Sequence, residues 1–270
     1  MANVAFGQYY PASSFTHKCD PRTKILFLIG FIVAIFLAKN FYALGVCALV
    51  FAIMACASKI PFKSLLKSVR AVLVLLIFTA VLNLFFQTEG EIIFEWYFIK
   101  LTKEGLYATA FLAVRLFLLV LASSLLTLTT TPVSLTDGLE SLLSPLKLIF
   151  FPVHELALVM SIALRFIPIL TDETARIMNA QKARGADFEN GTLTERVKAV
   201  VPILIPLLVS AFRRADELSD AMNARCYTGS TNRTKYKKLT FTWRDLLASL
   251  LLIALIVGVV FLKMHFPAVI

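Results

Sequence analysis

The chain alternates long apolar runs with short polar segments, a pattern typical of a helical membrane protein. A transmembrane helix needs roughly 20 apolar residues, and basic or aromatic flanking residues allow shorter runs to span. The pattern therefore predicts an all-α membrane protein with about five transmembrane helices. The runs that carry this prediction are residues 25–38, 41–57, 71–86, 105–131 and 246–262.

Lysine and arginine residues predict how these helices are oriented, because cytoplasmic loops carry an excess of both. The N-terminal arm is basic, with Lys18, Arg22 and Lys24, and so is the segment 58–70, whereas the segment 87–104 is net acidic. We therefore expect the N-terminus in the cytoplasm. Four spans then return the chain to the cytoplasm near residue 131, and a fifth leaves the C-terminus outside.

Residues 132–244 hold most of the charge and are expected in the cytoplasm. They carry 15 of the 27 Lys and Arg residues and 11 of the 17 Asp and Glu residues, which leaves 12 and 6 for the rest of the chain. Two apolar stretches inside the segment, 156–170 and 199–212, are either two further spans or helices outside the bilayer. The second alternative is favoured, because residues 199–212 are few, include two prolines and have basic residues at both ends.

This interpretation divides the chain into three parts. Residues 1–131 form the N-terminal arm and transmembrane helices 1–4, residues 132–241 form a cytoplasmic domain of long amphipathic helices, and residues 242–270 form the last transmembrane helix.

Capping signals predict two long helices within the cytoplasmic domain. Pro152 suits the first position of a helix, and Gly185 suits a left-handed C-cap after it. Residues 192–195, Thr-Leu-Thr-Glu, form a capping box that opens a second helix, expected to end near residue 226. Helices of about 32 and 35 residues would be about 48 and 52 Å long. Since both mix apolar and charged residues, they must pack on each other, on the membrane helices and on a partner.

The same short pattern closes both helices, with a spacing of 41 residues between the two arginines (225 − 184). The last carbonyl groups of a helix lack partners and carry partial negative charge, so an arginine is stabilised there. Its fork of donors suits carboxylates or carbonyls of another protein. The alternative is a pair of solvated caps, but repetition at two matching helix ends favours docking. The candidate docking residues are Ala183, Arg184, Gly185, Ala224, Arg225 and Cys226.

Other charged residues are interpreted as structural. The spacing upstream of the tips predicts pairs four residues apart on solvated helix faces, Asp172–Arg176 and Arg213–Glu217. Arg115 lies inside an apolar run, where we expect it to snorkel or to pair with a polar group such as Asn83 rather than to bind substrate.

Composition narrows the functional classes. Hydrophobic residues make up 59% of the chain, far above the level of soluble proteins. In such a protein the net charge of +10 is explained by the positive-inside rule and the anionic leaflet, without nucleic acid. The four cysteines and three histidines show no spacing of a disulfide framework or metal site. Neither a phosphate-binding GxxxxGK[ST] motif nor a catalytic triad stands out, so we expect no catalytic, metal or substrate site and no cofactor.

The chain resembles the T components (EcfT) of bacterial energy-coupling factor vitamin transporters, within the CbiQ-like transmembrane family. Residues 14–24, Ser-Phe-Thr-His-Lys-Cys-Asp-Pro-Arg-Thr-Lys, are similar to the family's N-terminal motif, with Cys19 where leucine is usual. The two tips are similar to its two Ala-Arg-Gly motifs. Cys226 replaces the second glycine, and cysteine tolerates a left-handed conformation poorly.

The resemblance implies an energy-coupling scaffold that is not an enzyme. It implies that Arg184 and Arg225 each dock on one of two ABC-type ATPase subunits (EcfA and EcfA′), which bind the ATP. It also implies that the apolar faces of 156–170 and 199–212 contact a substrate-binding S component, which reorients in the membrane when the ATPases move. A multi-pass protein of the bacterial cell membrane is expected, with residues 132–244 in the cytoplasm.

Two other classes remain as alternatives. A stand-alone secondary transporter usually shows internal repeats with broken helices and polar groups at the middle of the membrane. The repeat in this chain is a helix tip, and the apolar runs hold little charge. A membrane-bound enzyme would need a convergent catalytic set, which the sequence does not show.

Overall fold

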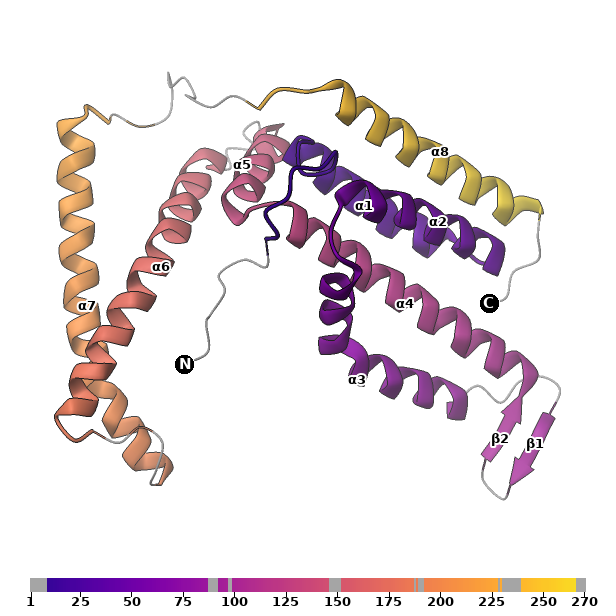
Figure 1. The fold of residues 1–270 in the computed structure, drawn as a ribbon, viewed down its shortest axis with the longest axis horizontal. Helices are drawn as coiled ribbons and strands as arrows, with labels where there is room; N and C mark the ends of the chain where they lie inside the picture. Colours follow the sequence, from indigo (N-terminus) through magenta and orange to yellow (C-terminus); the bar gives the residue numbers. More distant parts are fainter. Residues whose placement is uncertain are drawn as a thin grey trace. The chain divides into compact units, whose positions relative to one another are not determined.

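The computed structural model describes residues 9–86, 92–96, 99–145, 152–186, 188, 192–227, 229 and 239–265. The chain divides into two compact units, Met1–Leu142 with Lys238–Ile270, and Leu143–Lys237. The elements, labelled in Figure 1, are α1 Pro21–Leu37, α2 Phe41–Ser58, α3 Phe62–Phe86, β1 Ile92–Trp96, β2 Ile99–Thr102, α4 Lys103–Thr129, α5 Pro132–Leu143, α6 Val153–Ala183, α7 Leu193–Ala224 and α8 Trp243–His265.

The helices confirm the predicted class, an α-helical membrane protein. Four of them, α2, α4, α6 and α8, are long and apolar enough to cross a membrane, and α3 counts as a fifth if its two bent segments are taken together. The helix α1 has 17 residues and is about 25 Å long at 1.5 Å per residue. Because α6, like the others, is long and apolar enough to cross a membrane, these two properties alone do not decide whether it spans the membrane or lies outside the bilayer.

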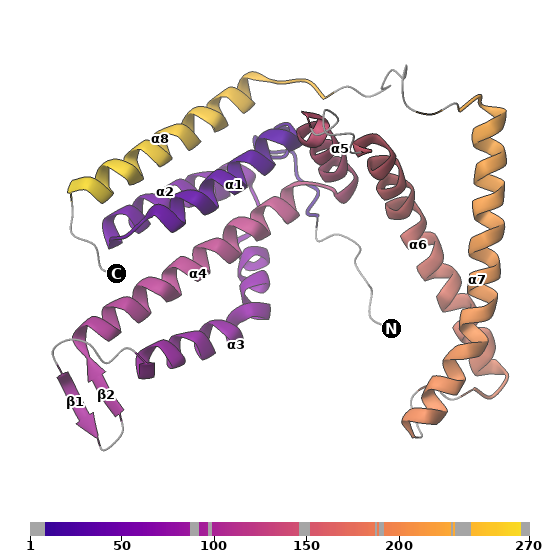
Figure 2. The same cartoon turned by 180° about the vertical axis from the view of Figure 1, so that it is seen from behind.

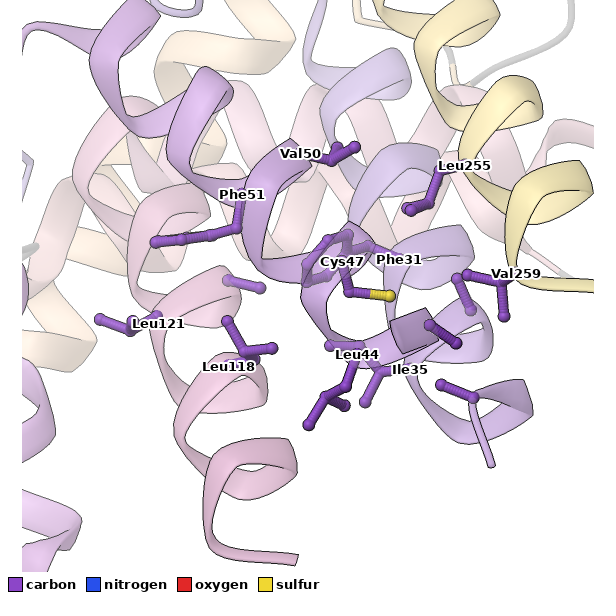
Figure 3. Packing of buried hydrophobic residues seen from close by; sticks show 14 of the residues in the cluster. Phe31, Ile35, Leu44, Cys47, Val50, Phe51, Leu118, Leu121, Leu255 and Val259 are labelled. Carbon is purple, nitrogen blue, oxygen red and sulfur yellow. The ribbon is translucent and has the colours of Figure 1, made fainter. Parts of the chain in front are cut away.

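The helices α1, α2, α4 and α8 lie side by side in the first unit (Figures 1 and 2). Their shared core is apolar, and Figure 3 shows it with Phe31, Cys47, Leu118 and Leu255 pointing toward one another. The outer faces are apolar too, and Phe36 of α1 and Ile253 of α8 are each 62% exposed. Residues of this kind face lipid in a membrane protein, so they need no protein partner.

A close approach joins α1 to α8. A Cβ atom on Gly30 would lie 2.8 Å from Cδ2 of Leu252, a distance that forces a shift of the side chain. Glycine at this position therefore allows Leu252 to pack against the backbone of α1, as small residues do between membrane helices.

The basic segment 58–70 contains a helix that the sequence pattern did not predict. The helix α3 begins at Phe62 and bends by 59° between residues 62–70 and 72–84. In the first segment Leu65 and Val69 are buried, whereas Lys63 and Lys67 are exposed. This amphipathic pattern with lysines on the polar face is typical of a helix that lies in the membrane interface.

The polar segment 87–104 contains a short hairpin. Its strands β1 and β2 pair antiparallel, with Glu95 opposite Lys100 and an irregular register between Ile92 and Phe94. The side chain of Thr102 then caps α4 by accepting a hydrogen bond from the amide of Gly105 at 3.2 Å.

The N-terminal arm is tied to two distant parts of the first unit. Asp20 is the N-cap of α1, where its carboxylate accepts a hydrogen bond from the amide of Arg22, and Pro21 occupies the first turn. The buried carboxylate of Asp245 in α8 accepts from the amides of Asp20 (2.7 Å) and Thr242 (2.8 Å). The Asp-Pro-Arg motif therefore starts α1 and joins it to α8, 225 residues away.

A second tie joins the arm to the end of α4. The amide of Tyr10 donates to the carbonyl of Leu128 at 3.0 Å, and Nζ of Lys24 donates to the carbonyls of Thr129 (3.0 Å) and His17 (3.3 Å). The bonds to Leu128 and Thr129 satisfy carbonyl groups that the last turn of α4 leaves without intrahelical partners.

Arg115 pairs with a polar group, as expected, but the group is a backbone carbonyl at the end of α1 rather than the side chain of Asn83. Its Nη2 donates to the carbonyl of Ala38 at 2.6 Å, and its guanidinium lies 4.7 Å from the ring centre of Phe111. The carbonyl is the C-cap group of α1, where the partial negative charge of the helix end favours a cation. Arg115 thus caps α1 instead of pairing with Asn83.

Candidate functional site: the arginine tips of α6 and α7

The helices α6 and α7 form within one or two residues of the predicted bounds. Pro152 is the N-cap of α6 rather than its first helical residue, and Glu155 lies in the first turn. Thr192 directly precedes α7, as predicted, and its hydroxyl lies 3.1 Å from that of Thr194. The side chain of Glu195, the acidic member of the predicted capping box, lies outside the described residues.

The first tip ends α6 in a Schellman motif. The amide of Gly185 donates to the carbonyl of Lys182, and the amide of Ala186 donates to that of Gln181, both at 3.0 Å. Gly185 has φ +90°, the left-handed region in which glycine meets no steric penalty. Arg184 is the last residue before this turn and so occupies the C-cap position.

The second tip repeats this geometry in spite of its cysteine. The amide of Cys226 donates to the carbonyl of Asn223 at 2.9 Å, and the amide of Tyr227 donates to that of Met222 at 3.0 Å. Cys226 has φ +57° and takes the place of glycine in the motif. Arg225 therefore occupies the same C-cap position as its counterpart, and the cost of the substitution is local strain.

Both arginines are available to a partner. Arg184 and Arg225 are exposed, together with their neighbours Ala183 and Ala224. Within the part of the chain that the structure describes, neither guanidinium is assigned a hydrogen bond or an ion pair. Small neighbours and a free donor fork suit contact with carboxylates or carbonyls on another protein.

The two tips lie at opposite ends of the second unit. Figures 1 and 2 both show α7 running back along α6 and crossing it, so the C-terminal ends point in opposite directions. The structure therefore does not bring the two arginines together into one site. It presents two separate tips on one pair of packed helices, a geometry that suits two binding partners or two copies of one partner.

A charged cluster joins the two helices where they cross. Glu173 of α6 accepts hydrogen bonds from Ser210 (2.8 Å) and from Nη2 of Arg214 (2.6 Å), both in α7. The side chains of Glu173 and Arg214 are 25% and 37% exposed, so the pair is screened only in part.

The ion pair in this cluster differs from the pairs predicted from the sequence. The predicted pairs Asp172–Arg176 and Arg213–Glu217 are not formed within the described helices. The adjacent residues Glu173 and Arg214 pair instead across the two helices. Sequence spacing identifies pairs on one helix, but it holds no information on which faces of two helices meet.

The remaining surface of the second unit is apolar over much of its length. Val159 of α6 and Ile205 of α7 are each 60% exposed, and Phe212 of α7 is 64% exposed. These residues lie in the two stretches that the sequence left open between spanning and partner-binding. No group of three or more His, Cys, Asp or Glu side chains among the described residues could hold a metal ion.

Comparison with known proteins shows the family. The family model for CbiQ, cobalt transport protein, matches residues 12–236. Three relatives are each described as an energy-coupling factor transporter transmembrane protein, EcfT. The protein of Ruminiclostridium cellulolyticum is 46% identical over 98% of this chain and 99% of its own length. The protein of Brevibacillus brevis is 49% identical over 95% of this chain and 97% of its own length. The protein of Bacillus subtilis is 45% identical over 97% of this chain and 99% of its own length.

The family model includes the N-terminal motif and both tips, and the relatives match nearly the whole chain. The apolar helices and the family together indicate a multi-pass membrane protein of a transport system. The chain belongs to the CbiQ family and, within it, to the transmembrane proteins of energy-coupling factor transporters.

Proposed function

We propose that this chain is the scaffold that couples two partner ATPases to a substrate-binding S component in a vitamin or micronutrient importer. The observation that carries the proposal is the pair of matched arginine C-caps, exposed at opposite ends of one unit. Two ATPases that move against each other need two separate contacts on a common body. The name that the relatives carry, energy-coupling factor transporter transmembrane protein, supports the same assignment.

In this mechanism each tip docks on one ATPase. Arg184 and Arg225 present donor forks to acidic or carbonyl groups of the partner, and the crossing of α6 and α7 carries the displacement of one tip to the other. The exposed apolar stretches 156–170 and 199–212 contact the S component. ATP is bound and hydrolysed by the partners, so the chain itself needs no cofactor and performs no catalysis.

Charge reversal at the tips tests the proposal. We expect Arg184→Glu and Arg225→Glu each to abolish transport and to reduce co-purification of the ATPases, because a carboxylate would face the partner's acceptors. Membrane insertion should be unchanged. Arg213→Glu is the matched control, since it reverses an exposed charge on α7 away from the tip.

Normal vitamin uptake by both tip variants would show that the docking role is wrong. Uptake by the purified chain alone in liposomes, driven by an ion gradient, would instead support a stand-alone secondary transporter. Turnover of a substrate by the purified chain without partners would support an enzyme.

A further inference from the structure

Two adjoining hollows lie along the N-terminal arm and the start of α8. The first, of about 250 Å³, is lined by Ser13, Ser14, Phe15 and Lys18 of the arm and by Trp243 and Arg244. The second, of about 470 Å³, is an apolar groove between α1 and α8 that includes Leu26 and Leu252. Trp243 lines both, so a polar end and an apolar end meet at one side chain.

The polar end has an excess of positive charge. Lys18 and Arg244 line it, and the guanidinium of Arg22 lies 5.7 Å from the ring centre of Phe241, which lines the groove. The opposing carboxylates, Asp20 and Asp245, already accept hydrogen bonds from backbone amides. Both oxygens of Asp245 accept hydrogen bonds, whereas Oδ2 of Asp20 is buried without a partner in the described part of the chain. Three cations against these two carboxylates leave an excess of positive charge, which favours an anionic ligand.

Two buried donors beside the groove have no protein partner. Nε of Arg22 and the hydroxyl of Thr23 are buried, and neither makes a hydrogen bond among the described residues. Thr23 is 7% exposed and lines the groove. Because buried polar groups nearly always have partners, these two atoms suit a ligand with acceptor oxygens, and the unpartnered Oδ2 of Asp20 suits a hydroxyl donor on the same ligand.

Trp243, which lines both hollows, is held in place by neighbouring side chains. The ring of Trp243 meets that of Phe15 edge-on at 5.9 Å, and the guanidinium of Arg244 lies 5.8 Å from it. Tryptophan is typical of the boundary between the apolar and polar regions of a bilayer.

We propose that this cleft is a binding site for an anionic phospholipid. The phosphate head group lies against Lys18, Arg22 and Arg244, and an acyl chain lies in the groove between Leu26 and Leu252. A zwitterionic lipid carries its own compensating cation and is therefore held more weakly. The basic residues of the arm place this end of the protein at the leaflet where anionic lipids are concentrated.

Native mass spectrometry of the purified full chain tests the site. The chain is equilibrated with equal amounts of phosphatidylglycerol and phosphatidylcholine, and the bound lipid is counted. We expect preferential retention of phosphatidylglycerol. Lys18→Gln and Arg244→Gln should each lower this preference about fivefold, and together ~25-fold, since each basic residue near an anionic surface contributes about 1 kcal/mol.

Two further variants distinguish binding in the cleft from a general attraction between a basic protein and an anionic lipid. Lys63→Gln with Arg70→Gln removes two exposed cations from α3, outside the cleft, and should leave the preference unchanged. Ser249→Phe fills the apolar groove without changing a charge and should lower retention of both lipids.

Three results would overturn the proposal. The first is equal retention of both lipids by the wild-type chain. The second is an equal loss in the cleft and α3 variants. The third is displacement of the lipid by millimolar glycerol phosphate, which would show a site for a free phosphate. If the cleft variants instead lose a partner protein on purification, the basic surface binds protein rather than lipid.

Discussion

At the scale of single residues, helix ends are capped by side chains and by residues with left-handed backbone angles. Gly185 and Cys226 adopt left-handed angles so that an arginine stands at each C-cap. Asp20 starts α1, and Arg115 ends it. The candidate site thus depends on cap geometry, because a frayed end would let the arginine move away from its partner.

The two left-handed residues should respond to substitution in opposite directions. Cys226→Gly removes a steric penalty and should stabilise the end of α7, whereas Gly185→Ala introduces one and should destabilise the end of α6. Each change should be about 1 kcal/mol, measured by hydrogen exchange of the amides in the two Schellman turns. A change of the same sign at both tips would contradict the assigned geometry.

The arm should loosen as the pH falls, because of His17. Burial lowers the pKa of His17; its hydrogen bond to the carbonyl of Tyr10 raises that pKa, and the charge of Lys24 lowers it. Nε2 donates to this carbonyl at 2.9 Å, so in the neutral ring Nδ1 accepts from the hydroxyl of Ser14 at 2.6 Å. The folded arm therefore favours the neutral ring.

A pKa below the unfolded value of about 6.5 means that the unfolded state binds more protons. The stabilisation of the folded arm by neutral His17 is complete above pH 6.5. It is lost as the pH falls through 6.5 toward the lowered pKa of His17 in the folded arm. We expect the protection of the arm's amides, which is the intrinsic exchange rate at the same pH divided by the observed rate, to decrease as the pH falls from 7.5 to 5.5. His17→Gln should remove this dependence, and His265→Gln, in the last turn of α8, should keep it.

At the scale of elements, the crossing of α6 and α7 depends on one polar cluster within an otherwise apolar surface. Glu173 meets Ser210 and Arg214 there. Apolar contacts would allow the helices to slide, whereas a charge-assisted pair selects one register. The cluster therefore sets the separation of the two tips.

Charge exchange at the crossing should be rescued by the double variant. Glu173→Arg and Arg214→Glu each place like charges together and should loosen the crossing, while the two combined restore an opposite pair. The double variant should recover most of what each single variant loses, a small effect because the pair is partly exposed. Distances between spin labels at the ends of α6 and α7 measure the effect.

Arg213→Glu provides the control for this experiment, because Arg213 is adjacent in the sequence but exposed. If the double variant is as loose as either single variant, the pair does not set the crossing.

At the scale of the whole molecule, the question is on which side of the membrane the tips lie. Charge distribution predicts the cytoplasm, and the exposed thiol of Cys226 is a natural reporter at the second tip. Burial raises the pKa of the Cys19 thiol to about 11, so this thiol in the arm stays protonated and unreactive at neutral pH.

A membrane-impermeant maleimide should label Cys226 in inside-out vesicles and leave it unlabelled in intact cells. The variant used keeps Cys226 and carries serine in place of Cys19, Cys47 and Cys56. Adding Lys39→Cys between α1 and α2 provides the control, because the same topology puts that turn outside. Labelling of Cys226 in intact cells would show that the tip is external and that it cannot contact cytoplasmic ATPases.

The elements themselves were largely predictable. The apolar runs, the limits of α6 and α7 and the residues of both tips follow from hydrophobic periodicity and capping residues, which act over a few neighbouring positions. The helical start of α3 and the hairpin β1–β2 were missed, because their polar residues resemble those of a loop.

By itself, then, the sequence determined the membrane class, the helices and the two arginine tips, since each of these depends on local chemistry. Only the tertiary structure decided which residues pair. It placed the tips at opposite ends, joined Glu173 to Arg214 and joined Asp20 to Asp245. Such contacts depend on which faces of distant helices meet, and that is settled by packing of the whole chain rather than by spacing along it.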